Sequence, residues 1–153
     1  MIPFYETLAQ RFHNLHQGIL NDLQSLPDEA LDWTPGQEMN SVSVIVVHLA
    51  GSERFLIGDV IMHDPSNRNR DAEFLAKGMT KADLTQRLDT AEAYLKSAFE
   101  NLSLDDLATE RQHPRQGTVT VAWALLHALD HAAEHMGHIE MTTQLWRQRE
   151  ERR

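Results

Sequence analysis

The chain has no cysteine among its 153 residues, which excludes disulfide bonds and thiolate metal ligands. It also lacks an apolar run of the ~20 residues needed to cross a bilayer, because the stretch from Val42 to Ala50 is soon broken by Ser52, Glu53 and Arg54. The opening residues MIPFYETLAQ show no basic stretch followed by an apolar one, so no export signal is expected. We therefore expect a cytoplasmic protein that has no membrane partner.

Basic side chains are also scarce. Lysine and arginine total 14 against 23 aspartates and glutamates, which gives a formal net charge of −9. A surface of that sign repels phosphate backbones, so nucleic acid is not an expected partner. The terminal RQREERR is locally basic, but it contains two glutamates, and its composition favours a frayed helix end over a binding arm.

Apolar residues recur at steps of three and four, the spacing of one helix face, along four stretches of the chain. The first stripe starts at Tyr5 and is closed by Pro27. The second can be capped by Asn40 or Ser41 and runs to about Met62. Its opening, VSVIVV, would also suit a buried strand. The length of the apolar pattern and the missing partner strands favour a helix.

The third stripe follows a Thr80–Asp83 pair that resembles a capping box, and the fourth runs from about Thr118 to Arg147. The connections HDPSNRNRD and SLDDLATERQHPRQG have the composition of loops. Four long amphipathic helices and no convincing strand predict an all-α four-helix bundle. The length of the chain predicts a single domain over residues 1–153.

Four of the nine histidines fall on the fourth predicted helix, between His127 and His138. A helix advances about 100° per residue, so these four side chains lie within about 80° of one another. His131 and His135 flank the apolar stripe and, being four residues apart, can converge on one ion. Neutral imidazole is a good ligand for zinc, nickel, copper or iron(II).

Two such ligands are seldom enough, because a zinc site with an open position normally takes three from the protein. His48 is the best candidate for the third, since it shares the inward face of its predicted helix with Val44 and Ile45. A neutral imidazole buried there without a partner would cost on the order of a few kcal/mol. A metal would remove that cost. A hydrogen bond to a carbonyl or carboxylate would remove it too, so both interpretations stay open.

The remaining histidines rank lower as ligands. His127 lies one turn before His131 and could serve as an alternative ligand or as a partner to one. His138 lies two turns from His131, which makes a shared ion awkward. The others are expected in solvent, at the edge of the first helix or in loops: His13, His16, His63 and His113.

The segment HAAEH also matches H-x-x-E-H, the inverted zincin signature, in which Glu134 would be the general base. A peptidase of that kind needs a third ligand and a substrate cleft. The sequence supplies no cleft-forming strand or second domain. An exposed carboxylate on the helix is therefore the preferred interpretation of Glu134.

Two stretches, NSVSVIVVHLAGSERFL and GTVTVAWALLHALDHAAEHMGHIEMTTQL, together resemble the DinB/YfiT-like superfamily, whose members are regarded as metalloenzymes. The resemblance covers most of the chain. Its features are an inward histidine after an Asn-Ser helix start, and H-x-x-x-H on a late helix followed closely by glycine. The family pattern there is roughly His-x-x-x-His-Arg-Gly-Gln-Ile, from which Met136 and His138 depart. The Leu-Asp-Trp before Pro35 and Gly36 is also similar to the family.

The resemblance implies a four-helix bundle with a divalent ion, commonly nickel or zinc, on His48, His131 and His135. Glu53 falls where the family often has an acid, but it lies about 140° around the helix from His48 and is not expected to be a ligand. Some members are transferases or isomerases that depend on low-molecular-weight thiols. By resemblance, the protein would activate such a thiol for attack on a small electrophilic substrate.

Two alternatives stay open at this point. One is metal-assisted hydrolysis, in which water replaces the thiol. The other is a non-catalytic bundle whose histidines serve structure or assembly. A bundle of this size with apolar faces also often forms a homodimer, although no residue in the sequence shows one.

Overall fold

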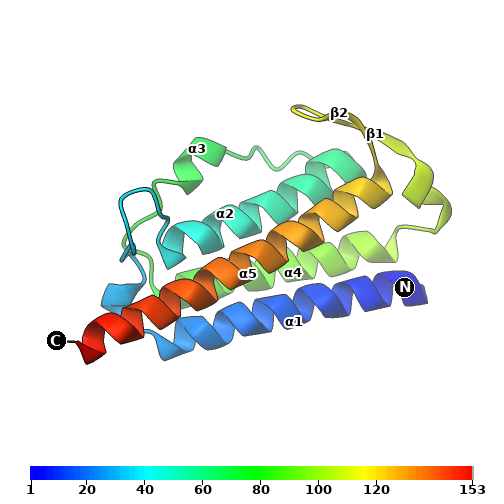
Figure 1. Ribbon diagram of the computed structural model, residues 1–153. Helices are drawn as coiled ribbons and strands as arrows, with labels where there is room; N and C mark the ends of the chain where they lie inside the picture. Colours follow the sequence, from blue (N-terminus) through cyan, green and yellow to red (C-terminus); the bar gives the residue numbers. More distant parts are fainter. Residues whose placement is uncertain (153) are drawn as a thin grey trace.

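The computed structural model describes residues 1–152, and most of them lie in long helices packed side by side (Figure 1). The second bundle helix continues into a π-helical segment, Phe55–Met62. The predicted four-helix bundle is confirmed. Its helices are α1 (Pro3–Ser25), α2 (Val42–Arg54), α4 (Lys81–Glu100) and α5 (Val121–Glu151).

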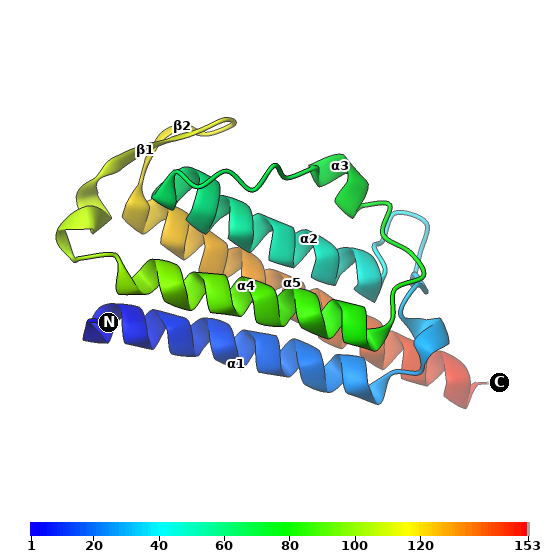
Figure 2. The same ribbon diagram turned by 180° about the vertical axis from the view of Figure 1, so that it is seen from behind.

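Each bundle helix has two neighbours in the bundle: α1 packs against α4 and α5, and α2 packs against the same two. Figures 1 and 2 show that α2 and α4 run in one direction and that α1 and α5 run in the other. Neighbouring parallel helices cannot be joined by a short turn, so the chain must travel back along the bundle after α2. Residues 63–80 make that journey. They include the short helix α3 (Arg70–Glu73), and we call them the return segment.

The apolar stripes of the four helices meet in one core, with aromatic rings packed at the end where α1 begins. The ring of Phe99 lies 5.7 Å from that of Tyr5 and 6.2 Å from that of Phe12, centroid to centroid, and all three are fully buried. Among residues 1–152, no helix is long and apolar enough to cross a membrane.

Two of the helix starts follow the predicted signals. The Ser41 hydroxyl accepts a hydrogen bond from the Val44 N–H at the start of α2. Thr80 and Asp83 form a reciprocal capping box at the start of α4. These caps satisfy backbone donors that the first turn of a helix leaves without partners.

The expectation of a chain without strands is wrong. The segment between α4 and α5 contains an antiparallel hairpin of β1 (Glu110–His113) and β2 (Gly117–Thr120). Gly117 has φ 73°, a left-handed conformation that glycine adopts without strain. All four residues of the TVTV stretch are β-branched, and such residues favour an extended chain.

The hairpin also moves the start of the last helix. Thr118, the predicted first residue of that helix, pairs with Gln112 in the hairpin. Thr120 caps α5 by accepting the Trp123 N–H, so the helix begins at Val121. It continues to Glu151, four residues beyond the predicted end at Arg147.

Candidate metal centre

Three histidines from two neighbouring helices converge on one another. His48 comes from α2, and His131 and His135 come from successive turns of α5. Nε2 of His131 lies 3.2 Å from Nε2 of His48 and 3.0 Å from Nε2 of His135. Their candidate ligand atoms all lie within 4.8 Å of one another. The structure thus brings together the three residues selected from the sequence.

The separations of the His131 nitrogen from the other two fit a shared metal ion. With metal–nitrogen bonds of about 2.0 to 2.1 Å, neighbouring ligand nitrogens stand about 2.9 Å apart in an octahedral site and about 3.3 Å apart in a tetrahedral one. The 3.0 and 3.2 Å separations fall between these values. If the lone pairs of all three nitrogens face one another, one imidazole N–H cannot be the partner of all of them. A cation between the nitrogens can bind all three lone pairs.

The electrostatics of the site keep the two imidazoles of α5 neutral. Burial and the neighbouring His135 lower the pKa of His131 to about 3. Burial and the neighbouring His48 lower the pKa of His135 to about 4. Both rings are therefore unprotonated ligands near neutral pH, which is the form that binds metals.

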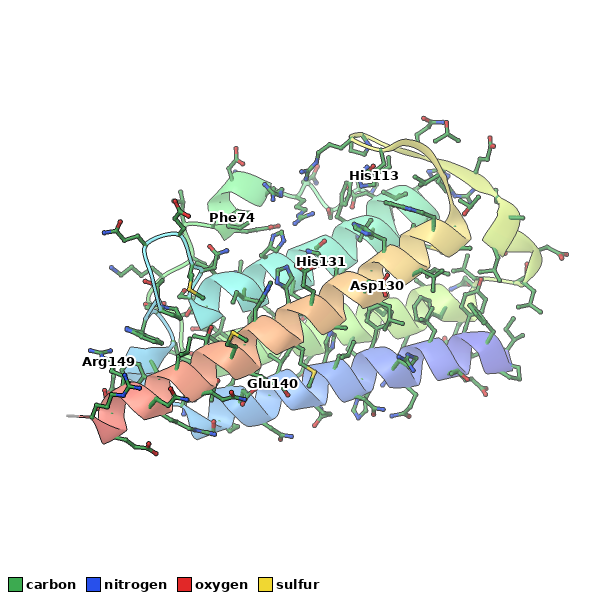
Figure 3. All side chains as sticks on the ribbon, in the orientation of Figure 1. Phe74, His113, Asp130, His131, Glu140 and Arg149 are labelled. Carbon is green, nitrogen blue, oxygen red and sulfur yellow. The ribbon has the colours of Figure 1, made fainter. Side chains whose placement is uncertain are left out.

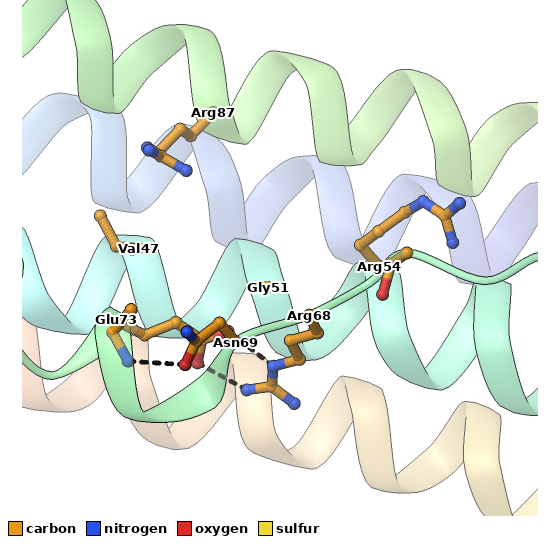
Figure 4. Close-up of a pocket in the computed structure, with 9 residues that line it drawn as sticks. Val47, Gly51, Arg54, Arg68, Asn69, Glu73 and Arg87 are labelled. Atoms are coloured by element: carbon orange, nitrogen blue, oxygen red, sulfur yellow. Dashed lines mark hydrogen bonds and ion pairs between the residues drawn. The ribbon is translucent and has the colours of Figure 1, made fainter.

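A buried carboxylate fixes the orientation of His48. Oε2 of Glu73, on α3, lies 2.9 Å from Nδ1 of His48, and Arg68 donates to both carboxylate oxygens at 2.6 and 2.7 Å (Figure 4). Burial raises the pKa of the Glu73 carboxyl, but hydrogen bonds from Arg68 and His48 outweigh it and leave that pKa lowered. Nη2 of Arg68 also approaches Nδ1 of His48, but at 3.3 Å, farther than the carboxylate at 2.9 Å. An ionised carboxylate only accepts, so the shorter contact favours a proton on Nδ1 of His48 and a lone pair on Nε2 that faces the other two histidines.

The return segment is itself held in place. The ring of Phe74 packs against His48 with a centroid distance of 4.8 Å. Near the start of the segment, Asp64 accepts hydrogen bonds from Arg54 at 2.8 Å and from the hydroxyl of Tyr94 at 2.7 Å. Burial and the hydrogen bond to Asp64 raise the pKa of Tyr94 to about 12. The segment that carries Glu73 and Phe74 is thus tied to both α2 and α4.

The two other histidines of α5 flank the group. His127 stacks on Trp123 with a centroid distance of 4.7 Å, and its ring centroid lies 6.3 Å from that of His131. Nδ1 of His138 lies 3.3 Å from Nδ1 of His135. In the described part of the chain, the group whose nitrogens converge contains neither His127 nor His138.

Glu53 lies outside the group, because it faces α1. Its carboxylate oxygens lie 2.9 and 3.0 Å from Nε2 of His16. Both side chains are 1% exposed, so the placement of His16 at the edge of the helix is wrong. The expectation of a solvated His13 holds only in part, because its Nδ1 lies 2.9 Å from Glu92.

Other sequence interpretations change with the hairpin and the return segment. His113, expected in a loop, is a buried residue of β1. Figure 3 shows His131 on the side of the bundle that the return segment and the hairpin cover, with Phe74 to one side and His113 to the other. Glu134 is an exposed residue of α5. Sequence reasoning missed Arg68 and Glu73, whose segment shows no periodic pattern.

The four-helix bundle and the order of its helices define the class of protein: the chain has a DinB/YfiT-like fold. More narrowly, it belongs to the family described as "Protein of unknown function (DUF1572)", whose model matches residues 2–152. A comparison with curated proteins found no match.

Three solved structures illustrate the shared fold. A conserved protein from Enterococcus faecalis is 16% identical, with a TM-score of 0.81 over 95% of this chain and 98% of that one. The DinB-like protein YjoA from Bacillus subtilis is 16% identical, with a TM-score of 0.69 over 90% of each chain. YfiT from Bacillus subtilis is described as a probable metal-dependent hydrolase with an unusual four-helix bundle topology. It is 15% identical, with a TM-score of 0.75 over 94% of this chain and 89% of that one.

Proposed function

We propose that this protein is a divalent-metal-dependent enzyme of the thiol-transferase type. His48, His131 and His135 hold one ion, and a low-molecular-weight thiol attacks a small electrophilic substrate beside them. The observation that carries the proposal is the convergence of three imidazole nitrogens from α2 and α5. A set of three nitrogen ligands suits nickel or zinc, which are the metals we expect.

Three neutral ligands leave the ion its full charge and at least one open position, which lowers the pKa of a thiol or water molecule in contact with it. The chain's own residues shape that position. Glu73 holds the His48 ring by its Nδ1–H and makes Nε2 a better ligand. Phe74 covers one face of the same ring and keeps water away from it.

The surroundings of the centre favour a thiol over water. Within residues 1–152, no carboxylate joins the three-histidine group. Glu73 already accepts hydrogen bonds from Arg68 and His48 and is not free to act as a base. A thiol, with an ordinary pKa of about 8.5, needs less help to ionise than water does. Because the chain has no cysteine, the thiol must come from a co-substrate.

Metal-assisted hydrolysis is the second candidate, because YfiT, which shares the fold, is described as a probable metal-dependent hydrolase. The two reactions differ in their dependence on a thiol. Metal-loaded protein is screened against small electrophiles with several biological thiols and without any, using His48→Ala as the inactive reference. We expect products that contain the thiol. Thiol-independent cleavage that is lost in His48→Ala would favour the hydrolase.

The metal centre is tested first by elemental analysis of protein purified without a nickel column. We expect about one divalent ion per chain in the wild type and a large loss in His131→Ala. The matched control is His127→Ala, one turn away on the same helix, which should keep its metal. Negligible metal in the wild type and in both variants, together with a melting temperature that chelators do not change, would indicate a non-catalytic bundle.

The remaining expectations concern partners and location: a small-molecule substrate, a homodimer and a cytoplasmic location. The colibactin self-resistance protein ClbS, which was solved with double-stranded DNA, shares the fold at 14% identity and a TM-score of 0.60, over 94% of this chain and 95% of that one. The net charge of −9 still predicts no DNA binding here. A mobility-shift assay at physiological salt tests this, and sedimentation velocity tests the dimer.

A further inference from the structure

A small pocket of about 160 Å³ opens directly onto the His48 and His131 side of the centre. It lies between α2, the return segment, the hairpin and α5. Three arginines contribute to its lining, namely Arg68, Arg70 and Arg115. None of the described residues that line it is acidic. We call this cavity the basic pocket.

The charge of the basic pocket is opposite to that of the chain. The protein has only 14 lysines and arginines and a net charge of −9, yet three of its arginines line one small cavity. Arg68 is neutralised by Glu73. Arg70 and Arg115 are exposed at the rim, and within residues 1–152 neither makes an ion pair with a carboxylate. A concave surface lined by one sign of charge concentrates ligands of the other sign.

The position of Arg115 is fixed by the hairpin. The ring of His113 packs between Phe55 and Trp123, with centroid distances of 5.6 and 5.9 Å. Its Nδ1 accepts the backbone N–H groups of Arg115 and Gln116, each at 3.1 Å. The turn that carries Arg115 is therefore anchored to the bundle through a buried ring. Arg70, on α3, is steadied over the Phe74 ring at 4.8 Å.

The other side of the centre has a different chemistry. A cavity of about 230 Å³ beside His135 has a mostly apolar wall surface, to which Met39, Ile45 and Met141 contribute. Its described lining contains no lysine or arginine, and Glu38 is part of it. An anionic group is therefore favoured on the basic side only. A ligand that spans the three histidines would therefore meet basic side chains at one end and a less polar cavity at the other.

We propose that the basic pocket is an anion subsite in which Arg70 and Arg115 bind a carboxylate or phosphate group of the substrate or co-substrate. A less polar part of the reacting pair then occupies the cavity beside His135. Guanidinium groups suit either anion, because their paired N–H donors match the spacing of its oxygens. The assignment rests on the proposed function for its role in catalysis, but the binding of the anion itself does not need the metal.

The test is calorimetric titration of chelator-treated protein with succinate and, separately, with inorganic phosphate. The double variant Arg70→Gln/Arg115→Gln is compared with Arg11→Gln/Arg87→Gln, an equal charge change at exposed positions outside the basic pocket. Loss of two charge-assisted contacts should weaken binding about tenfold or more, and the control pair should bind as the wild type does. The better of the two probes identifies the anion. Circular dichroism verifies the folding of both pairs.

Two results would overturn the subsite: equal affinity in all three proteins, or no measurable binding to the wild type with or without added zinc. The result of this titration is independent of the test of the metal centre. Anion binding by a wild-type protein that elemental analysis finds free of metal would refute the proposed function and leave the subsite standing. A metal-loaded protein that binds neither probe would do the reverse.

Discussion

The buried pair of His16 and Glu53 gives a prediction about stability that does not depend on any ligand. The two side chains join α1 to α2 across the core, each 1% exposed, with contacts of 2.9 and 3.0 Å. Removing one partner leaves the other buried without its hydrogen bonds. Breaking a buried pair in this way costs about 3 to 5 kcal/mol. We therefore expect Glu53→Ala to lower the free energy of unfolding by an amount in that range.

This loss depends on pH. Burial lowers the pKa of His16, but the charge and hydrogen bonds of Glu53 and the charge of Glu92 outweigh it and raise that pKa above the ordinary value. A histidine whose pKa is raised by folding contributes its full stabilisation below its unfolded pKa of about 6.5. The contribution disappears as the pH rises through the folded pKa. The cost of Glu53→Ala should thus be larger at pH 6 than at pH 8.5.

The assay is urea unfolding followed by circular dichroism at both pH values, with a chelator present to exclude metal effects. For a chain of this length, about 1 kcal/mol corresponds to about 2 to 4 °C in melting temperature, so thermal scans should show a fall of at least about 6 °C at pH 6. The control is the double variant His16→Leu/Glu53→Leu, which leaves no polar group unpaired and should recover much of the loss.

A change in Glu53→Ala of less than about 0.5 kcal/mol at pH 6, the size expected of a surface substitution, would refute this account of the pair. So would a loss that grows toward pH 8.5, because the linkage would then have the opposite sign. In the first case the short distances between His16 and Glu53 would not mark a stabilising interaction. In the second case the interaction would be stabilising, but not through protonation of His16.

Two further predictions concern the support of His48. Glu73→Gln should weaken metal binding about 10- to 100-fold, the usual effect of removing the partner of a ligating histidine. Zinc titration against a chromophoric chelator measures this affinity. An unchanged affinity would contradict the role of Glu73. Gly51→Ala improves helix propensity by up to about 1 kcal/mol, yet its Cβ would overlap the Glu73 carboxylate. We expect Gly51→Ala to lower metal affinity in the same titration, with Gly137→Ala, whose Cβ meets open space, as the matched control.

The bundle and its histidines could be predicted because each depends on a periodic signal. His131 and His135 are four apart on a helix whose apolar stripe fixes which face turns inward. His48 sits on an equally periodic helix. The convergence of the three follows from packing α2 against α5, and the resemblance to the DinB/YfiT-like superfamily selected the same residues.

The remainder of the site has no such signal. Arg68 and Glu73 lie in a segment with no repeating pattern, and their pairing depends on how that segment crosses the bundle. The hairpin was missed because its strands are four residues each, too short for alternation to stand out from a loop. His16 and Glu53 were underestimated for a related reason: each is polar, and only three-dimensional packing shows that they bury one another.

The topology of the bundle explains why these unpredictable segments matter most at the centre. Because α2 and α4 are parallel, the chain must run back along α2, and this path takes Glu73 and Phe74 directly over His48. Antiparallel neighbours joined by short turns would leave that histidine uncovered. Likewise, the connection into α5 brings Arg115 beside His131. The helices thus supply the candidate ligands, whereas the connections orient them and set the charge of the basic pocket beside them. Substitutions in the connections should therefore change ligand preference with little effect on the stability of the bundle.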